Sequence, residues 1–182
     1  MTKVALIIGS LRRESWSRKL AAELRGLAPA QWQLTELPIG GLALYNADLE
    51  ADPPREWLDF RAAIRDADAL LFVSPEYNRS LPGSLKNAVD VASKPNGQNC
   101  WPGKPALVMT QSTGPLGGLA GSYALKQVLA GVNVATMPHP EVYLSRIATL
   151  FDGEGHLVAD TQAFLRGVLA SFETWIARFA PR

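Results

Sequence analysis

Cysteine is almost missing from this chain, and Cys100 is its only thiol. A disulfide within one molecule is therefore excluded, which is typical of proteins that work in a reducing compartment. No apolar run approaches the roughly 20 residues that a membrane-spanning helix requires, and the N-terminus lacks the apolar segment of a signal peptide. We therefore expect a cytoplasmic protein that does not insert into a membrane.

A large charge of one sign is missing as well. The chain has 18 Lys and Arg residues against 17 Asp and Glu, which gives a formal net charge of +1 at pH 7. A strongly basic balance would favour nucleic acid or an acidic membrane surface as a partner, so we expect neither. The 182 residues, 47% of them hydrophobic, suffice for one domain with a sizeable core. Because no repeat or linker divides them, we predict a single domain over residues 1–182.

Several sequence signatures of catalysis are also absent. The chain contains no P-loop sequence G-x-x-x-x-G-K-[ST], no G-x-G-x-x-G after an apolar strand and no G-x-S-x-G. These absences argue against a magnesium-dependent NTPase, a separate dinucleotide site of the Rossmann type and a serine hydrolase. The 2 histidines, His139 and His156, have no cysteine at ligand spacing, so we expect no metal site.

The chain does contain short apolar runs that alternate with segments of helical character. The runs predict strands at residues 4–8, 69–73, 106–109 and 132–137, with a more polar strand at 32–37. The segments between them predict helices at residues 17–27, 55–65, 82–93, 119–129 and 161–179. This alternation indicates right-handed crossovers and a parallel sheet with helices on both faces. Five strands in this length favour the doubly wound, flavodoxin-like α/β fold.

Ligands of such sheets bind outside the carboxyl ends of the strands, which directs attention to three loops. The first, residues 9–17, reads G-S-L-R-R-E-S-W-S. Arg12 and the serine hydroxyls are donors suited to phosphate oxygens, and the start of a helix adds unpaired N–H groups. Without a P-loop lysine, this loop indicates one terminal phosphate dianion. An ordinary helix cap at Ser15 with solvated arginines accounts for the same residues.

The second and third loops are unusual in other ways. Residues 74–83 read S-P-E-Y-N-R-S-L-P-G, where Tyr77 offers a flat face for an aromatic ligand and Asn78 tolerates unusual backbone angles. Glu76 could act as a general acid or base, although a lone carboxylate is more often a surface residue or a cap. Residues 111–121 read Q-S-T-G-P-L-G-G-L-A-G, whose glycines allow close backbone approach to a bulky ligand or simply form a flexible connection.

Together these three segments resemble the NADPH-dependent FMN reductase family, and within it the chromate and quinone reductase branch. The resemblance runs from residue 4 to about residue 141 and includes P-E-Y-N followed by P-G-S-L-K-N-A-V-D. It implies a flavodoxin-like fold that holds FMN non-covalently. The residues that it implies as cofactor-binding are Ser10, Leu11, Arg12, Ser15, Trp16, Ser17, Pro75, Glu76, Tyr77, Asn78, Gln111, Ser112, Thr113, Gly114 and Gly117.

Two positions depart from the family pattern. Ser17 stands where asparagine is usual in the phosphate segment, and Leu119 stands where an arginine is common after G-G. The first change bears on the affinity for FMN, and the second on the acceptor preference and the assembly of subunits.

The resemblance implies an oxidoreductase in which the flavin carries the chemistry and no side chain is catalytic. NADPH or NADH would pass a hydride to FMN, and a small-molecule acceptor would then take two electrons in a ping-pong reaction. Quinones are the expected acceptors, with chromate and azo compounds as further candidates. One alternative is a flavin reductase that releases reduced FMN to a partner oxygenase. Another is a flavodoxin-like electron carrier, although such carriers tend to be strongly acidic.

The resemblance also implies a homodimer or homotetramer with the site at the subunit interface. In the sequence, the segment H-P-E-V-Y-L at residues 139–144 is expected to expose apolar groups. Tyr123 and Trp101 are expected to flank the flavin, although Trp101 could equally pack within its own subunit.

Overall fold

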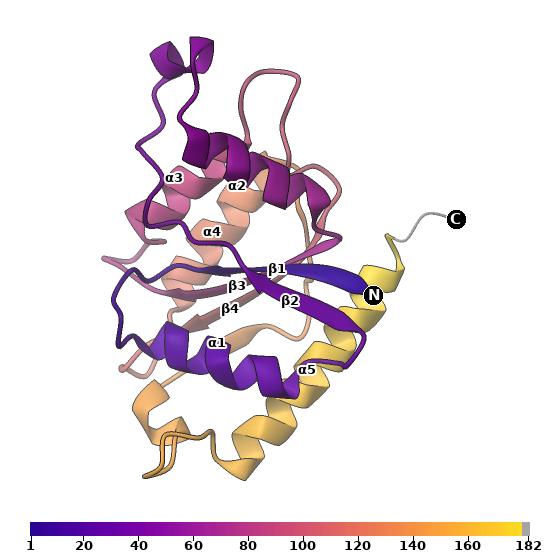
Figure 1. Cartoon of the computed structure of the whole chain (residues 1–182). Coiled ribbons are helices and arrows are strands. Elements are labelled where there is room, and N and C mark those ends of the chain that lie inside the picture. Colours follow the sequence, from indigo (N-terminus) through magenta and orange to yellow (C-terminus); the bar gives the residue numbers. More distant parts are fainter. Residues whose placement is uncertain (180–182) are drawn as a thin grey trace.

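The computed structural model of the chain describes residues 1–179. A parallel sheet forms the middle layer, and its strands follow the order β2-β1-β3-β4-β5, with β6 also paired to β4 (Figure 1). The strands are β1 Thr2–Ile8, β2 Trp32–Glu36, β3 Ala69–Pro75, β4 Pro105–Gln111, β5 Ala135–Thr136 and β6 Val142–Leu144. This is the flavodoxin-like strand order, so the predicted fold class is confirmed.

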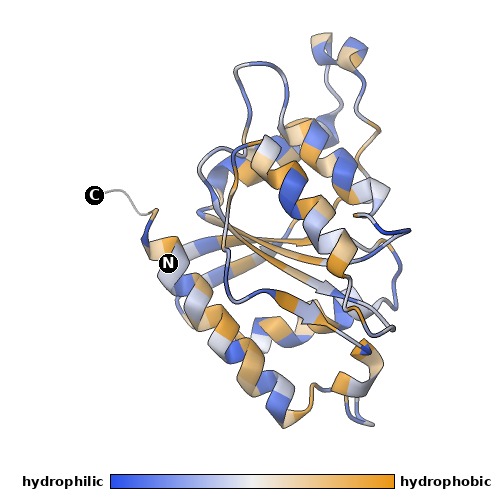
Figure 2. Ribbon diagram, turned by 180° about the vertical axis from the view of Figure 1, so that it is seen from behind, coloured by the Kyte–Doolittle hydropathy of each residue, from blue (hydrophilic) through white to orange (hydrophobic). Residues whose placement is uncertain are grey.

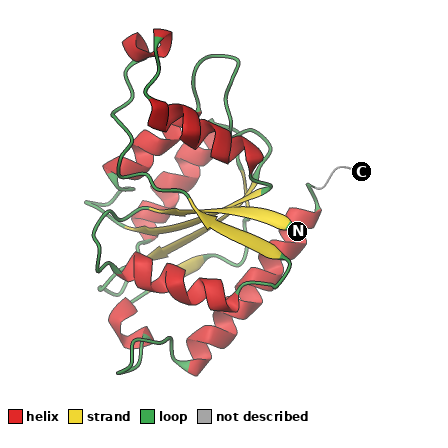
Figure 3. Ribbon diagram, in the orientation of Figure 1, coloured by secondary structure: helices red, strands yellow, loops and turns green. Residues whose placement is uncertain are grey.

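Helices cover both faces of the sheet, as the alternation of the sequence predicts (Figure 3). One face packs against α1 Trp16–Leu27 and α5 Ala159–Ala177, and the other against α2 Arg55–Asp66, α3 Gly83–Ala92 and α4 Leu119–Gly131 (Figure 1). Two short 3₁₀ helices, η1 Ala47–Ala51 and η2 Ile147–Leu150, complete the described elements. None of the helices within residues 1–179 is long and apolar enough to cross a membrane.

The central strands are apolar on both sides because both sides are covered. In β1, Leu6 points into the cluster beneath α1 and α5, whereas its neighbour Ile7 points into the cluster beneath α2, α3 and α4. Figure 2 shows the hydrophobic residues concentrated on the strands and on the helix faces that meet them. Each fully buried Leu or Ile side chain contributes about 1.5–3 kcal/mol to folding, so these runs fix which segments are central.

The fifth strand differs from the predicted 132–137. Val132 still belongs to the end of α4, where its N–H donates to the carbonyl of Leu129. Only Ala135–Thr136 pair with β4, and a second segment, Val142–Leu144, resumes the pairing further along the same strand. Pro138 and Pro140 lie between the two segments and have no N–H to donate to a ladder.

This second segment also corrects the expectation for residues 139–144. Val142 and Leu144 are only 1% and 5% exposed, because both side chains lie in the core cluster beneath α1 and α5. The segment therefore does not present its apolar side chains to a partner.

The expectation that Trp101 flanks the site is wrong. Trp101 precedes β4, so it lies at the opposite edge of the sheet from the carboxyl ends of the strands. Its side chain is 0% exposed, its indole N–H donates to the carbonyl of Val89 at 2.9 Å, and its ring lies 6.3 Å from that of Phe60. Packing within its own subunit, the other interpretation of the sequence, is what the structure shows.

We predict that Trp101→Ala lowers the free energy of unfolding by about 3–5 kcal/mol, because it leaves a cavity in the core. Urea denaturation of the apoprotein measures this loss. The control is Leu44→Ala, because Leu44 is 78% exposed and a surface change of this kind stays within about 0.5 kcal/mol. A Trp101→Ala protein as stable as the Leu44→Ala control would contradict the assignment of Trp101 to the core.

Candidate functional site

Three loops meet at one edge of the sheet because three neighbouring strands end together. The register pairs Ile8 of β1 with Val73 of β3, and Pro75 of β3 with Gln111 of β4. The first loop (residues 9–15), the second loop (residues 76–82) and the third loop (residues 112–118) therefore leave the sheet side by side. The structure thus brings together the three segments that the sequence singles out.

The first loop begins at a tightly packed glycine. A Cβ on Gly9 would lie 2.4 Å from the hydroxyl oxygen of Ser74, and the Gly9 N–H donates to the carbonyl of Val73 at 2.9 Å. Ser10 follows and is buried, whereas Leu11 is half exposed. The chain is therefore held against β3 where it leaves the sheet.

The same loop ends in a helix start that can bind an anion. The hydroxyl of Ser15 accepts the N–H of Arg18 at 3.2 Å, so Ser15 is the N-cap of α1. The N–H groups of Trp16 and Ser17, in the first turn, have no partner inside a helix and add a partial positive charge. The helix cap and the phosphate site are thus compatible interpretations of one structure.

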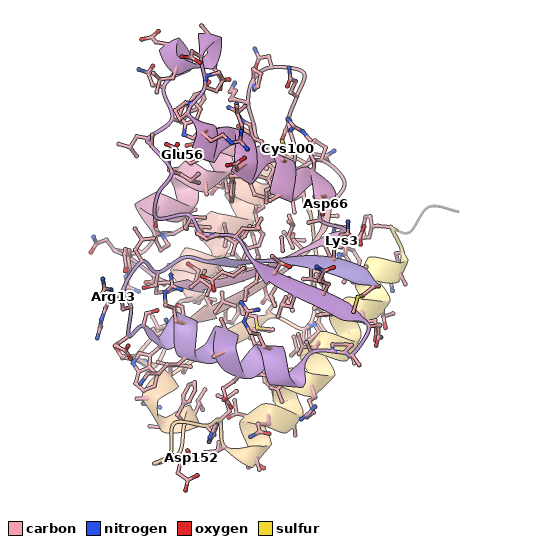
Figure 4. All side chains as sticks on the ribbon, viewed as in Figure 1. Lys3, Arg13, Glu56, Asp66, Cys100 and Asp152 are labelled. Atoms are coloured by element: carbon pink, nitrogen blue, oxygen red, sulfur yellow. The ribbon has the colours of Figure 1, made fainter. Side chains whose placement is uncertain are left out.

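Two arginines of the first loop are free to meet a ligand. Arg12 and Arg13 are both exposed, and neither forms an ion pair with a residue in the range 1–179. Figure 4 shows Arg13 projecting from the loop, away from the sheet. The loop therefore offers cations beside the start of α1, as a phosphate dianion requires.

Ser17 and Gln111 form a buried polar pair beneath the loops. The side-chain amide of Gln111 donates to the Ser17 hydroxyl at 3.0 Å, and the two residues are only 5% and 0% exposed. The pair joins the first turn of α1 to the end of β4 across 94 positions of sequence. Because both side chains are engaged and covered, what these residues present to a ligand is chiefly their backbone.

The second loop is a tight turn with strained backbone angles. Tyr77 and Ser80 exchange two backbone hydrogen bonds of 2.9 and 3.0 Å, and the two residues between them, Asn78 and Arg79, have φ values of 49° and 64°. Positive φ at both central positions defines a type I′ turn, which favours Asn and Gly but strains Arg. Within residues 1–179 the N–H groups of Asn78 and Arg79 donate no backbone hydrogen bond, and the Tyr77 side chain is 49% exposed. Pro75, the last residue of β3, is half-buried beneath it.

Glu76 has a structural partner. One carboxylate oxygen of Glu76 accepts the N–H of Gly121 at 3.0 Å. Gly121 lies in the first turn of α4, whose N-cap, Gly118, has no side chain to supply a cap. Of the roles that the sequence leaves open for Glu76, the structure favours that of a cap, supplied from another loop.

Two glycines of the third loop, Gly117 and Gly118, lie close to neighbouring segments of the chain. Gly117 and Gly118 have φ values of 60° and 79°. A Cβ on Gly117 would lie 2.6 Å from the carbonyl carbon of Tyr143, and one on Gly118 would lie 3.0 Å from Cβ of Thr110. Both positions therefore require glycine, as expected where a loop lies close to neighbouring backbone.

The segment after β6 also borders the third loop, which the sequence did not indicate. The Arg146 N–H donates to the carbonyl of Gly114 at 2.8 Å, and Ser112 exchanges backbone hydrogen bonds with Leu144 and Ile147. Thr113, which lies between Ser112 and Gly114 in the sequence, is exposed. Arg146 is exposed with a φ of 45°, a backbone angle that cannot be inferred from the residue type.

Tyr123 is exposed on α4 as expected, and it lies within a small charged cluster. The Lys126 ammonium group is 5.9 Å from the Tyr123 ring, 5.6 Å from the Tyr143 ring and 2.7 Å from a carboxylate oxygen of Glu141. Burial raises the pKa of the Tyr143 hydroxyl, and the neighbouring Glu141 raises this pKa further. The Tyr143 phenol therefore stays protonated and cannot serve as a base at neutral pH. In the part of the chain that the structure describes, no three acidic, His or Cys side chains gather as metal ligands would.

Fold and site together define a flavodoxin-like oxidoreductase. The sequence of residues 2–149 matches the family described as NADPH-dependent FMN reductase, and the chain belongs to this family. It is accordingly an enzyme that uses FMN with NAD(P)H. The predicted family, enzyme class and cofactor are confirmed.

Named relatives cover nearly the whole chain. A quinone reductase of Pseudomonas putida is 47% identical over 174 residues, 95% of this chain and 94% of the relative. A 2-hydroxy-1,4-benzoquinone reductase of Burkholderia sp is 40% identical over 175 residues, 96% of each. Among solved structures, the flavoenzyme NAD(P)H:(acceptor) oxidoreductase FerB of Paracoccus denitrificans has a TM-score of 0.93 and 39% identity, covering 98% of this chain and 99% of that one.

We predict that Ser17→Ala destabilises the apoprotein by about 1–3 kcal/mol, because it leaves the buried Gln111 amide without its acceptor. A double-mutant cycle with Gln111→Leu, measured by urea denaturation, isolates the pair. The coupling should be about 0.5–3 kcal/mol, since replacing both partners removes the unpaired group. Additive losses would mean that the two side chains do not depend on each other.

Proposed function

We propose that this chain is an FMN-dependent NAD(P)H:quinone oxidoreductase built as a single domain, which works by a two-electron ping-pong mechanism. The observation that carries the proposal is the meeting of a capped helix start, a type I′ turn and a closely packed glycine loop at one edge of the sheet. The similarity to the two quinone reductases supports the acceptor class. When bound, FMN supplies the hydride-accepting chemistry that no side chain of the chain offers.

In this proposal the first loop holds the phosphate of FMN. Arg12 provides a charged fork, and the N–H groups at the start of α1 provide further donors and a partial positive charge. The serine hydroxyls of the loop add neutral donors, apart from that of Ser17, which is engaged by Gln111. This donor set fits a phosphate monoester, because it offers several N–H and O–H groups and the cationic side chain of Arg12 at one helix start.

The second and third loops would enclose the flavin ring. The N–H groups of Asn78 and Arg79 would donate to oxygen and nitrogen atoms of the ring, and Tyr77 offers an exposed aromatic face. The residues from Gln111 to Gly117 would form the other border of the ring. Donors of this kind stabilise negative charge that develops on the ring during reduction, without a catalytic acid or base.

Exposed arginines around the loops would attract the nicotinamide nucleotide. Arg79 and Arg146, like Arg12 and Arg13, are exposed and form no ion pair within residues 1–179. These four arginines would place positive charge at the rim of the site, where it favours the approach of an anionic substrate.

Exposed apolar side chains at the same rim support a homodimer or homotetramer. Leu11, Tyr77, Leu116 and Tyr123 come from all three loops and from the start of α4, and each is about half exposed. Apolar groups gathered around a shallow site favour a second subunit as its missing wall. We propose the cytoplasm as the compartment, since Cys100 is the one thiol of the chain and is free.

The decisive experiment identifies the bound cofactor and then the kinetic order. Heat release from the purified protein should yield FMN, and steady-state rates with NADPH and a quinone should give parallel double-reciprocal lines. Chromate and azo dyes tested in the same assay measure how far the acceptor range extends. A colourless protein that turns over added FMN would favour release of reduced flavin to an oxygenase. Exchange of electrons only with protein partners would favour a carrier.

We predict that Arg12→Ala weakens FMN binding while leaving the fold intact. Loss of a charged hydrogen bond costs about 1.5–3 kcal/mol, which corresponds to a Kd that is raised about 10- to 150-fold. FMN titration of the apoprotein, followed by fluorescence, measures the change. Arg166→Ala is the control, because Arg166 is exposed on α5 away from the three loops. Equal affinity of the two variants would show that the phosphate lies elsewhere.

A further inference from the structure

A single carboxylate connects the second loop to the third. Glu76 begins the second loop, and its side chain accepts the N–H of Gly121 at 3.0 Å, in the first turn of the helix that the third loop leads into. The two residues are 45 positions apart in sequence. The second and third loops, which enclose the flavin ring in the proposed function, are therefore joined by one charged hydrogen bond.

Gly121 allows α4 to lie close to the second loop. A Cβ at this position would lie 3.1 Å from Cα and Cβ of Glu76 and 3.1 Å from the carbonyl oxygen of Ser80. These distances are shorter than ordinary van der Waals contact, so any larger residue would have to push the turn away from α4. Ser80 closes the type I′ turn, so the helix packs directly on the strained part of the second loop.

The strained turn needs such a support. Its two central residues lack the glycine that a positive φ favours, and only two backbone hydrogen bonds close it. Glu76 in turn supplies the cap that α4 lacks, because Gly118 has no side chain. The N-terminus of α4 thus supports the strained turn, and Glu76, just before the turn, caps α4.

We propose that Glu76 is a positioning residue for the flavin. Its bond to Gly121 sets the spacing between the amides of the 77–80 turn and the third loop, and its negative charge balances the partial positive charge of the α4 N-terminus. The inference rests on the proposed function, since it concerns how tightly FMN is held and how the oxidised and reduced forms are balanced. It assigns Glu76 a role through Gly121 and not through proton transfer.

Two variants of Glu76 separate the effect of its hydrogen bond to Gly121 from the effect of its negative charge. Glu76→Ala removes both, and the FMN Kd should rise about tenfold or more, as expected for a lost charged hydrogen bond. Glu76→Gln keeps an oxygen acceptor for the Gly121 N–H, so FMN affinity should stay within about threefold of the parent. It removes the negative charge, so the midpoint potential should become more positive by about 14 mV, the equivalent of about threefold for a two-electron couple.

Gly121→Ala tests the spacing without touching the carboxylate. Alanine favours a helix more than glycine does, which offsets strain from the displaced turn, so the melting temperature of the apoprotein should change little. FMN binding should nevertheless weaken by about tenfold, because the new methyl group displaces the turn. A loss of FMN affinity without a matching loss of apoprotein stability distinguishes positioning of the flavin from a general contribution to folding.

Glu23 provides the matched control. Its carboxylate also accepts a backbone N–H from a distant segment, that of Leu157 at 3.0 Å, but outside the three loops. Glu23→Ala and Glu23→Gln should change the melting temperature of the apoprotein and leave both the FMN Kd and the midpoint potential unchanged.

The outcomes separate this inference from the proposed function. A parent protein that binds no FMN overturns both. If the parent binds FMN and Glu76→Ala binds it equally well, only the positioning role is wrong. Should Glu76→Ala fail to fold, Gly121→Ala still decides, and unchanged FMN affinity in that variant overturns the inference. A midpoint potential of Glu76→Gln equal to that of the parent overturns the charge-balancing part.

Discussion

The hydrogen-bond ladder between β1, β3 and β4 is the interaction on which the rest of the structure depends. It aligns Ile8 with Val73 and Val73 with Met109, so three parallel strands end at one edge. The loops that follow are far apart in sequence and lie side by side only because of this register. The sheet determines where donors can converge, and the loops determine which donors they are.

Much of the fold could be predicted from local sequence, because the central strands are buried on both faces and read as unbroken apolar runs. Prediction from local sequence fails where tertiary contacts override that pattern. The run at residues 132–137 looks like one strand, but the helix before it extends to Gly131 and two prolines divide what remains. Trp101 sits among loop residues in the sequence, and only the packing of its indole beneath α3 and β3 assigns it to the core.

The candidate site, like the fold, has parts that local sequence predicts and parts that it does not. The three loops could be recognised because their composition is unusual within each loop. The pairs that hold them, Gln111 with Ser17 and Glu76 with Gly121, join residues 94 and 45 positions apart. No spacing rule connects such residues, so their partnership emerges only once the register is known. Motif recognition thus indicated the candidate site and left the supporting contacts beneath it undescribed.

The division of the last strand has a consequence for the protein in a crowded cell. An edge strand with a continuous row of unpaired N–H and C=O groups invites another sheet to add to it. Here the edge beyond β4 consists of two short pieces, Ala135–Thr136 and Val142–Leu144, separated by Pro138 and Pro140. A neighbouring chain finds no uninterrupted template there. The interruption therefore protects this edge from the addition of a further strand.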